Sequence, residues 1–128
     1  MRDQGLHNES VSELLWNSGG FDDWVVTTAF YAALKLVNHE LFPYTNGTNI
    51  YPDFNYYYQT LPFRRRKCKH QETIQLVKRN IRSVQAFYRR LHDASMTARY
   101  ADYNITTRAI AQMARQDLAA VKLACAKP

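Results

Sequence analysis

The hydrophobic positions along the chain follow the spacing of α-helices, and turn residues separate them. Over residues 6–17 the apolar side chains fall on one side of a short helix, which the Asn17-Ser18-Gly19-Gly20 cluster ends. Residues 22–42 predict a second helix, with two carboxylates in its first turn and Pro43 as its stop. This second helix is apolar nearly all round. A helix without a polar face belongs in the middle of a bundle.

The helical pattern returns at His70. Apolar residues then recur in steps of three and four and form the packing seam of a third helix, which comprises Ile74, Val77, Ile81, Val84, Tyr88 and Leu91. A kink in this helix is conceivable near Asn80. A last helix is predicted to begin at an N-cap residue between Asn104 and Thr107 and to bury Ile110, Met113, Ala114, Leu118, Val121 and Cys125. We therefore expect one all-α domain over residues 1–128, a bundle of four or up to five helices.

The segment between the second and third helices, residues 43–69, has a different character. It holds three of the four prolines, an Asn46-Gly47 pair that fits a short hairpin, and a run of aromatic residues. A connection this long is usually functional or partly ordered. Tyr56, Tyr57 and Tyr58 cannot all point inward, so burial, a subunit interface and stacking on nucleic-acid bases all remain open; Tyr57 is our candidate for base contact.

Positive charge is concentrated in one part of the chain. The net charge is +6, and the region from Arg64 to Arg90 holds ten basic residues and a single acid, Glu72. Such a field attracts polyanions, and arginine grips phosphates with a planar fork. We therefore expect RNA or a nucleotide as partner, although a solubilising helix face has a similar composition. The candidate contacts are Arg66, Lys67, Lys69, Lys78, Arg79, Arg82 and, further on, Arg99.

Several classes of protein do not fit. The four glycines lack the spacing of a phosphate-binding loop, and the longest apolar stretch, Trp24 to Leu36, is too short and too polar to cross a membrane. The first ten residues have no hydrophobic signal core, and two isolated cysteines indicate reduced thiols, so we expect a cytoplasmic protein. His39 and His92 lack further ligands at metal-binding spacing and are expected to make local hydrogen bonds. We predict no metal and no cofactor.

Three parts of the sequence resemble the small HEPN-like helical domains. The first is the run from Asp23-Trp24 through Phe30-Tyr31-Ala32-Ala33-Leu34, with Lys35 where that family often has His. The second is His70 at the start of a helix, and the third is Leu91, Ser95 and Ala98-Arg99-Tyr100. The resemblance implies a helical bundle that is frequently dimeric and often a metal-independent ribonuclease of toxin or defence systems. Possible protein partners are an antitoxin or a nucleotidyltransferase.

The family's ribonucleases use an Arg followed, after four to six residues, by a His. Arg65 and His70 fit this spacing, as do Arg64 and His70, although Arg66 and Lys67 stand where an Asn or Asp is typical. An imidazole could exchange a proton with a ribose hydroxyl, and an arginine could stabilise charge on the phosphate. Alternatively, His70 is only a helix-start residue and Arg99 only bonds carbonyls at a helix end. The protein would then be a non-catalytic dimeric module that docks on nucleic acid or an acidic protein.

Overall fold

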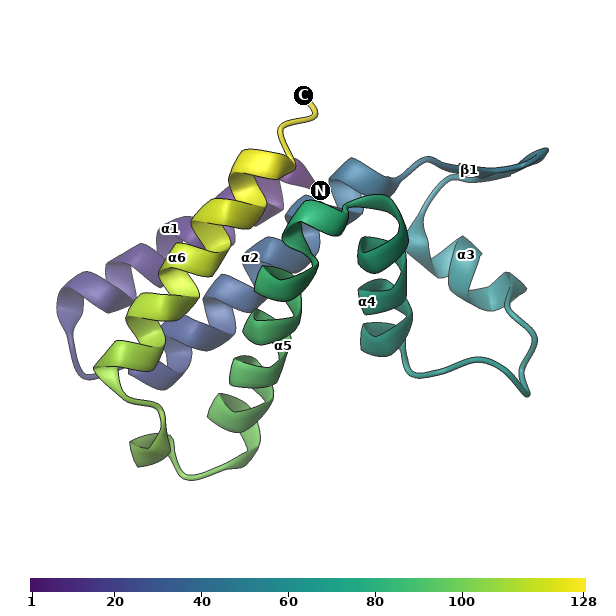
Figure 1. Cartoon of the computed structure of the whole chain (residues 1–128). Helices are drawn as coiled ribbons and strands as arrows, with labels where there is room; N and C mark the ends of the chain where they lie inside the picture. Colours follow the sequence, from purple (N-terminus) through teal and green to yellow (C-terminus); the bar gives the residue numbers. More distant parts are fainter.

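The computed structural model describes all 128 residues and confirms an all-α helical bundle (Figure 1). Four long helices form its main body: α1 (Arg2–Ser18), α2 (Asp22–Leu41), α5 (Gln85–Tyr100) and α6 (Arg108–Ala124). Two shorter helices, α3 (Phe54–Thr60) and α4 (Lys69–Asn80), lie to one side with a small hairpin of β1 (Tyr44–Asn46) and β2 (Asn49–Tyr51). Short 3₁₀ helices, η1 (Arg82–Val84) and η2 (Tyr103–Ile105), precede α5 and α6. No helix is long and apolar enough to cross a membrane.

Helix α2 is the central helix, as its apolar sequence predicts. It packs against α1, α5 and α6, and against α4 near its middle. Eleven of its residues are buried, among them Val25, Phe30 and Leu36. Because this helix is covered on several sides, it holds the largest share of the core and fixes the positions of its neighbours.

The third helix of the sequence pattern is two helices. The apolar seam continues through Ile81 and Val84, but α4 ends at Asn80, where Ile81 leaves helical geometry with φ −132° and ψ 59°. The chain then reverses through η1, so that α4 and α5 lie side by side (Figure 1). A helical periodicity therefore persists across a turn that it does not reveal.

The connecting segment is more ordered than a loop. The hairpin considered for Asn46-Gly47 is present, with Tyr44 opposite Tyr51 and Gly47 at φ +63°, a value that favours glycine. Helix α3 was not predicted; Asp53 caps it by accepting a hydrogen bond from the Tyr56 N–H at 2.8 Å. An aromatic cluster holds hairpin and helix together and comprises Phe42, Tyr44, Tyr51, Phe54 and Tyr57.

The last helix begins where expected, because the Thr107 hydroxyl accepts a hydrogen bond from the Ile110 N–H at 3.3 Å. Ala114, Leu118, Val121 and Cys125 are buried, as predicted. The expectation for two other residues was wrong, since Ile110 is 38% exposed and Met113 47% exposed. Both side chains instead line a cavity between α5 and α6.

Helices α1 and α2 approach closely at Gly5. A Cβ atom there would lie 3.0 Å from Cγ of Leu36 and 3.3 Å from the carbonyl oxygen of Ala32. We predict that Gly5→Ala lowers the free energy of unfolding by about 1–3 kcal/mol through overpacking, despite alanine's higher helix propensity. Urea denaturation measures the change. Gln4→Ala, at an exposed position of the same turn, is the control and should change stability by less than about 0.5 kcal/mol. An unchanged or higher stability of Gly5→Ala would contradict the close approach.

Candidate functional site

His70 lies in the first turn of α4 and packs against α2. A hydrogen bond ties the chain before this helix to its first turn, since the Lys67 N–H donates to Oε1 of buried Glu72 at 3.1 Å. The half-buried imidazole of His70 meets the Phe30 ring edge-on, with ring centroids 5.4 Å apart. The histidine predicted to open a helix therefore sits at the boundary between core and solvent.

A second histidine lies beside the first. The ring centroids of His70 and His92 are 5.5 Å apart, and His92 lies equally far from Phe30. His92 is buried, and its Nδ1 is 3.2 Å from Oδ1 of Asp93, which confirms the expected local hydrogen bond. His39 instead bonds the distant carbonyl oxygen of Pro128 at 2.9 Å.

One face of α5 supplies most of the site. Tyr88, His92, Ser95 and Arg99 recur every three or four residues and therefore share a face of the helix. Tyr88 packs against Phe30, and its buried hydroxyl has no hydrogen-bond partner. Burial raises the pKa of this hydroxyl, so Tyr88 stays protonated.

Arg99 is held in place by two helices. Its Nη1 donates to the Tyr31 hydroxyl of α2 at 2.8 Å, and its Nε donates to the Ser95 carbonyl oxygen at 3.3 Å. The carbonyl bond fits the helix-end role considered for Arg99, whereas Tyr100 is 74% exposed and does not pack in the core. No carboxylate pairs with Arg99, so its charge is not neutralised by an ion pair.

The cluster, which we call the histidine–arginine site, comprises His70, His92, Arg99 and Tyr31. Burial lowers the pKa of His70 below its usual 6.5, and the proximity of His92 and of the Arg99 guanidinium lowers it further. A neutral imidazole at pH 7 can accept a proton, and an arginine beside it can hold an oxyanion. The arrangement therefore suits proton transfer next to a bound anion.

No hydrogen bond joins the side chain of Arg64 or Arg65 to His70. Both side chains are exposed on a turn after α3, where the Arg65 N–H donates to the Pro62 carbonyl at 3.0 Å. Neither guanidinium makes a hydrogen bond, an ion pair or a contact with an aromatic ring. The arginine whose charge acts on His70 is Arg99, and a role for Arg64 or Arg65 at this histidine stays a prediction.

Residues 63–69, which lead into the first turn of α4, form a surface that we call the basic turn. Arg66 lies over two rings, with its Cζ 4.8 Å from the centre of Tyr58 and 5.2 Å from that of Phe63. The Tyr58 hydroxyl donates to the Lys67 carbonyl at 2.8 Å. Phe63 is 83% exposed. The other candidate contacts on this turn and beyond it, all exposed, are Lys67, Lys69, Lys78, Arg79 and Arg82.

The tyrosine chosen for base contact is the inward-facing member of its row. Tyr57 is 6% exposed and packs in the aromatic cluster, whereas Tyr56 is 52% exposed. Burial raises the pKa of Tyr57, and the nearby charge of Arg79 opposes this effect. The most accessible aromatic ring in the connecting segment is instead Phe63, and the sequence pattern did not predict its exposure.

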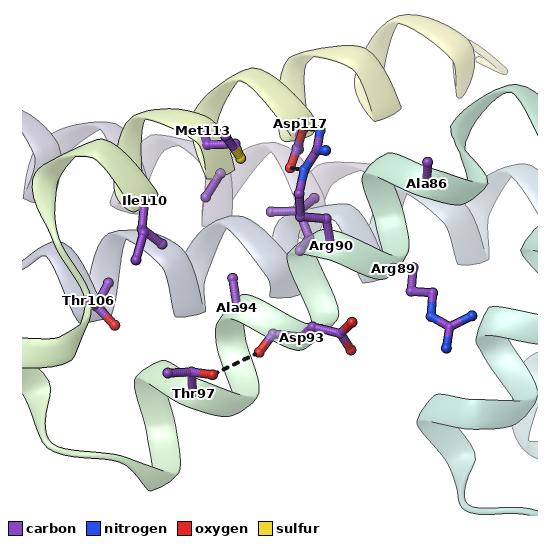
Figure 2. A pocket seen from close by; sticks show the side chains of 12 residues that line it. Ala86, Arg89, Arg90, Asp93, Ala94, Thr97, Thr106, Ile110, Met113 and Asp117 are labelled. Carbon is purple, nitrogen blue, oxygen red and sulfur yellow. Dashed lines mark hydrogen bonds and ion pairs between the residues drawn. The ribbon is translucent and has the colours of Figure 1, made fainter.

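A separate cavity of about 560 Å³ lies between α5 and α6 (Figure 2). Its floor is apolar and includes Ile110 and Met113. Arg90 and buried Asp117 pair at one end through two hydrogen bonds of 2.8 and 2.6 Å, which raises the pKa of Arg90. The charge of Arg90, counted in the basic region, is thus already neutralised. No group of three or more His, Cys, Asp or Glu side chains is arranged to hold a metal ion.

A hydrogen bond between Arg99 and Tyr31 joins α5 to α2 at the site. We predict that Tyr31→Phe and Arg99→Gln each lower the free energy of unfolding, and that the double variant loses about 0.5–1.5 kcal/mol less than the sum. A double-mutant cycle by urea denaturation measures this coupling. Tyr100→Phe with Arg99→Gln is the matched control. The Cζ of Arg99 lies 5.3 Å from the centre of the Tyr100 ring and 5.5 Å from that of Tyr31, but only Tyr31 shares a hydrogen bond with Arg99, so the control cycle should be additive. Additivity in both cycles would contradict the link.

Comparison with known proteins adds no family to this description. No protein-family model, curated protein or solved structure matches the chain. The resemblance to HEPN-like domains therefore stays a prediction.

Proposed function

We propose that this protein binds RNA and cleaves its backbone by acid–base chemistry at the histidine–arginine site. The observation that supports the proposal most is the position of half-buried His70 beside His92 and Arg99. A lowered pKa leaves His70 free to accept a proton near neutral pH. The guanidinium of Arg99 already has a fixed position, so it can bind a phosphate with little reorganisation.

In the proposed reaction, His70 removes the proton from a ribose 2′-hydroxyl. The 2′-oxygen then forms a bond to phosphorus, the bond from phosphorus to the 5′-oxygen breaks, and the proton returns from His70 to that leaving oxygen. Arg99 and the Tyr31 hydroxyl hold the non-bridging phosphate oxygens, whose charge grows in the transition state. Buried His92, supported by Asp93, acts as a positioning residue behind His70. This chemistry needs neither a metal nor a cofactor.

The basic turn supplies the binding surface for RNA. It leads along the chain directly into His70, so a strand held on the turn lies close to the reacting group. Its exposed cations neutralise phosphates, and the Phe63 ring offers a face for an unpaired base. The ring contacts of Arg66 reduce the conformational freedom of this surface before RNA arrives.

A second function has support from the same turn. The exposed basic residues do not depend on the histidine–arginine site, so they could serve a non-catalytic module that docks on nucleic acid or on an acidic protein. In that case the partner could be an antitoxin or a nucleotidyltransferase, and the module could be a homodimer. Binding of RNA without any cleavage would favour this alternative.

Cleavage of end-labelled tRNA and total RNA in EDTA tests the proposal. We predict that His70→Gln lowers the cleavage rate by about 10²–10⁴-fold, because the proton acceptor is lost. Arg99→Gln should lower the rate by about 10²-fold or more, because the transition-state charge loses a donor. Arg65→Gln is the matched control and should affect RNA affinity rather than the rate at saturating RNA.

All variants should be purified identically and shown to be folded by circular dichroism. Cleavage that is unchanged in His70→Gln would contradict the proposed chemistry. A rate that falls in Arg65→Gln but not in Arg99→Gln would support the pair of Arg65 and His70, predicted from sequence spacing, over the proposed pair of Arg99 and His70.

A further inference from the structure

A hollow of about 240 Å³ adjoins the histidine–arginine site and shares Arg99 with it. Helix α2 contributes Asp23, Trp24 and Thr27 to this hollow, the end of α5 and the residue after it contribute Ala98, Arg99 and Ala101, and η2 contributes Tyr103. Typical pockets for drug-sized ligands measure about 300–1,000 Å³, so this one suits a smaller group such as a single planar base.

Two aromatic side chains of the hollow are exposed. Trp24 is 55% exposed and Tyr103 65% exposed, although they come from different elements. Exposed large aromatic side chains that gather around one concavity mark a binding surface more often than isolated ones do. Their faces can stack on a base, which is the usual way in which proteins hold unpaired nucleotides.

Asp23 gives this hollow a chemical preference. Its half-buried carboxylate has no hydrogen bond and no ion pair, whereas the neighbouring Asp22 is paired with Arg108 at 3.1 Å. A carboxylate only accepts hydrogen bonds. Guanine presents two adjacent donors, N1–H and N2–H₂, to its two oxygens, while the Watson–Crick edges of the other three bases place an acceptor beside each donor.

The spacing along α2 fits one nucleotide. Trp24 and Tyr31 are seven residues apart, which is two helical turns or about 10 Å along the axis, and they lie on the same side of the helix. Arg99 contacts Tyr31 and also lines the hollow. A phosphate at Arg99 therefore leaves its own or the adjacent base within reach of Trp24.

We infer that the hollow binds the guanine base of an RNA nucleotide whose phosphate lies at Arg99, an inference that rests on the proposed function. Trp24 and Tyr103 stack on the base, Asp23 accepts hydrogen bonds from N1–H and N2–H₂, and Arg99 joins base recognition to the phosphate. The protein then cleaves RNA next to guanines.

Nucleotide binding to the intact protein tests the hollow without any need for cleavage. Quenching of tryptophan fluorescence by GMP, AMP, CMP and UMP gives four affinities, and Trp24→Phe identifies the signal of Trp24. We expect GMP to bind at least about fivefold more tightly than the other three, the low end for a bidentate base contact. Asp23→Asn should remove this preference. Asp3→Asn, which changes an exposed aspartate in the first turn of α1, is the control and should keep it.

Two further measurements keep the inference falsifiable. Tyr103→Ala, in the exposed η2, should weaken binding of all four nucleotides by about fivefold or more through lost stacking. Short RNA strands with a single guanine should be cut next to that guanine and should compete with GMP. Strands that do not compete with GMP would show a site for free nucleotides and would overturn the assignment to RNA.

The outcomes distinguish a failure of guanine binding in the hollow from a failure of the proposed cleavage at His70. Equal affinities for the four nucleotides, or a guanine preference that survives Asp23→Asn, overturn the inference even if His70-dependent cleavage is found. A guanine preference that depends on Asp23, together with competition by the guanine strand, supports the hollow even if no RNA is cut. In that second case it is the proposed function that fails.

Discussion

The burial of α2 is the constraint on which the rest of the molecule depends. This helix has no polar face, so the chain has to cover it, and α1, α5, α6 and α4 pack against it. The arrangement brings residues of α4 and α5 to Phe30 and Tyr31 of α2. For that reason His70 and His92 lie against the Phe30 ring, and Arg99 donates to the Tyr31 hydroxyl.

The site combines burial with unbalanced positive charge. His70 is partly removed from water, and its neighbours are another imidazole and a guanidinium, so its cationic form is disfavoured. The fixed charge of Arg99 remains available because no carboxylate pairs with it. By contrast, the larger cavity between α5 and α6 places its buried carboxylate, Asp117, in a bidentate pair with Arg90. The proposed chemistry is therefore assigned to the histidine–arginine site, whose arginine has no carboxylate partner.

The sequence predicts the helical class, the central helix and an N-cap between Asn104 and Thr107, because each depends on local residues and spacing. It does not predict the reversal after Asn80, since the apolar periodicity continues through Ile81 and Val84. It also misses α3, whose short length and aromatic composition resemble a loop. Tyr57 was selected from three consecutive tyrosines that cannot all be buried, and in the structure it is the buried one.

The sequence predicts two residues of the histidine–arginine site but not how the site is assembled. His70 and Arg99 could be selected from the resemblance and from their residue types. Their grouping with Tyr31 and His92 could not, because these four positions are brought together only by packing around α2. Spacing along the chain instead favours Arg65 as the partner of His70, and the structure places that arginine on an exposed turn. The sequence likewise does not show that Asp23 lines one hollow with Trp24 and Tyr103.

In the proposed function, His70 and Arg99 form one site that binds an anion and accepts a proton. The most direct measurement is an NMR titration of the imidazole C2 proton of His70, assigned with His70→Gln. We expect a pKa below 6.5 that rises in Arg99→Gln and rises when a non-cleavable 2′-deoxy dinucleotide binds, because a phosphate stabilises the imidazolium. A pKa at or above 6.5 that responds neither to the substitution nor to the dinucleotide would contradict the account.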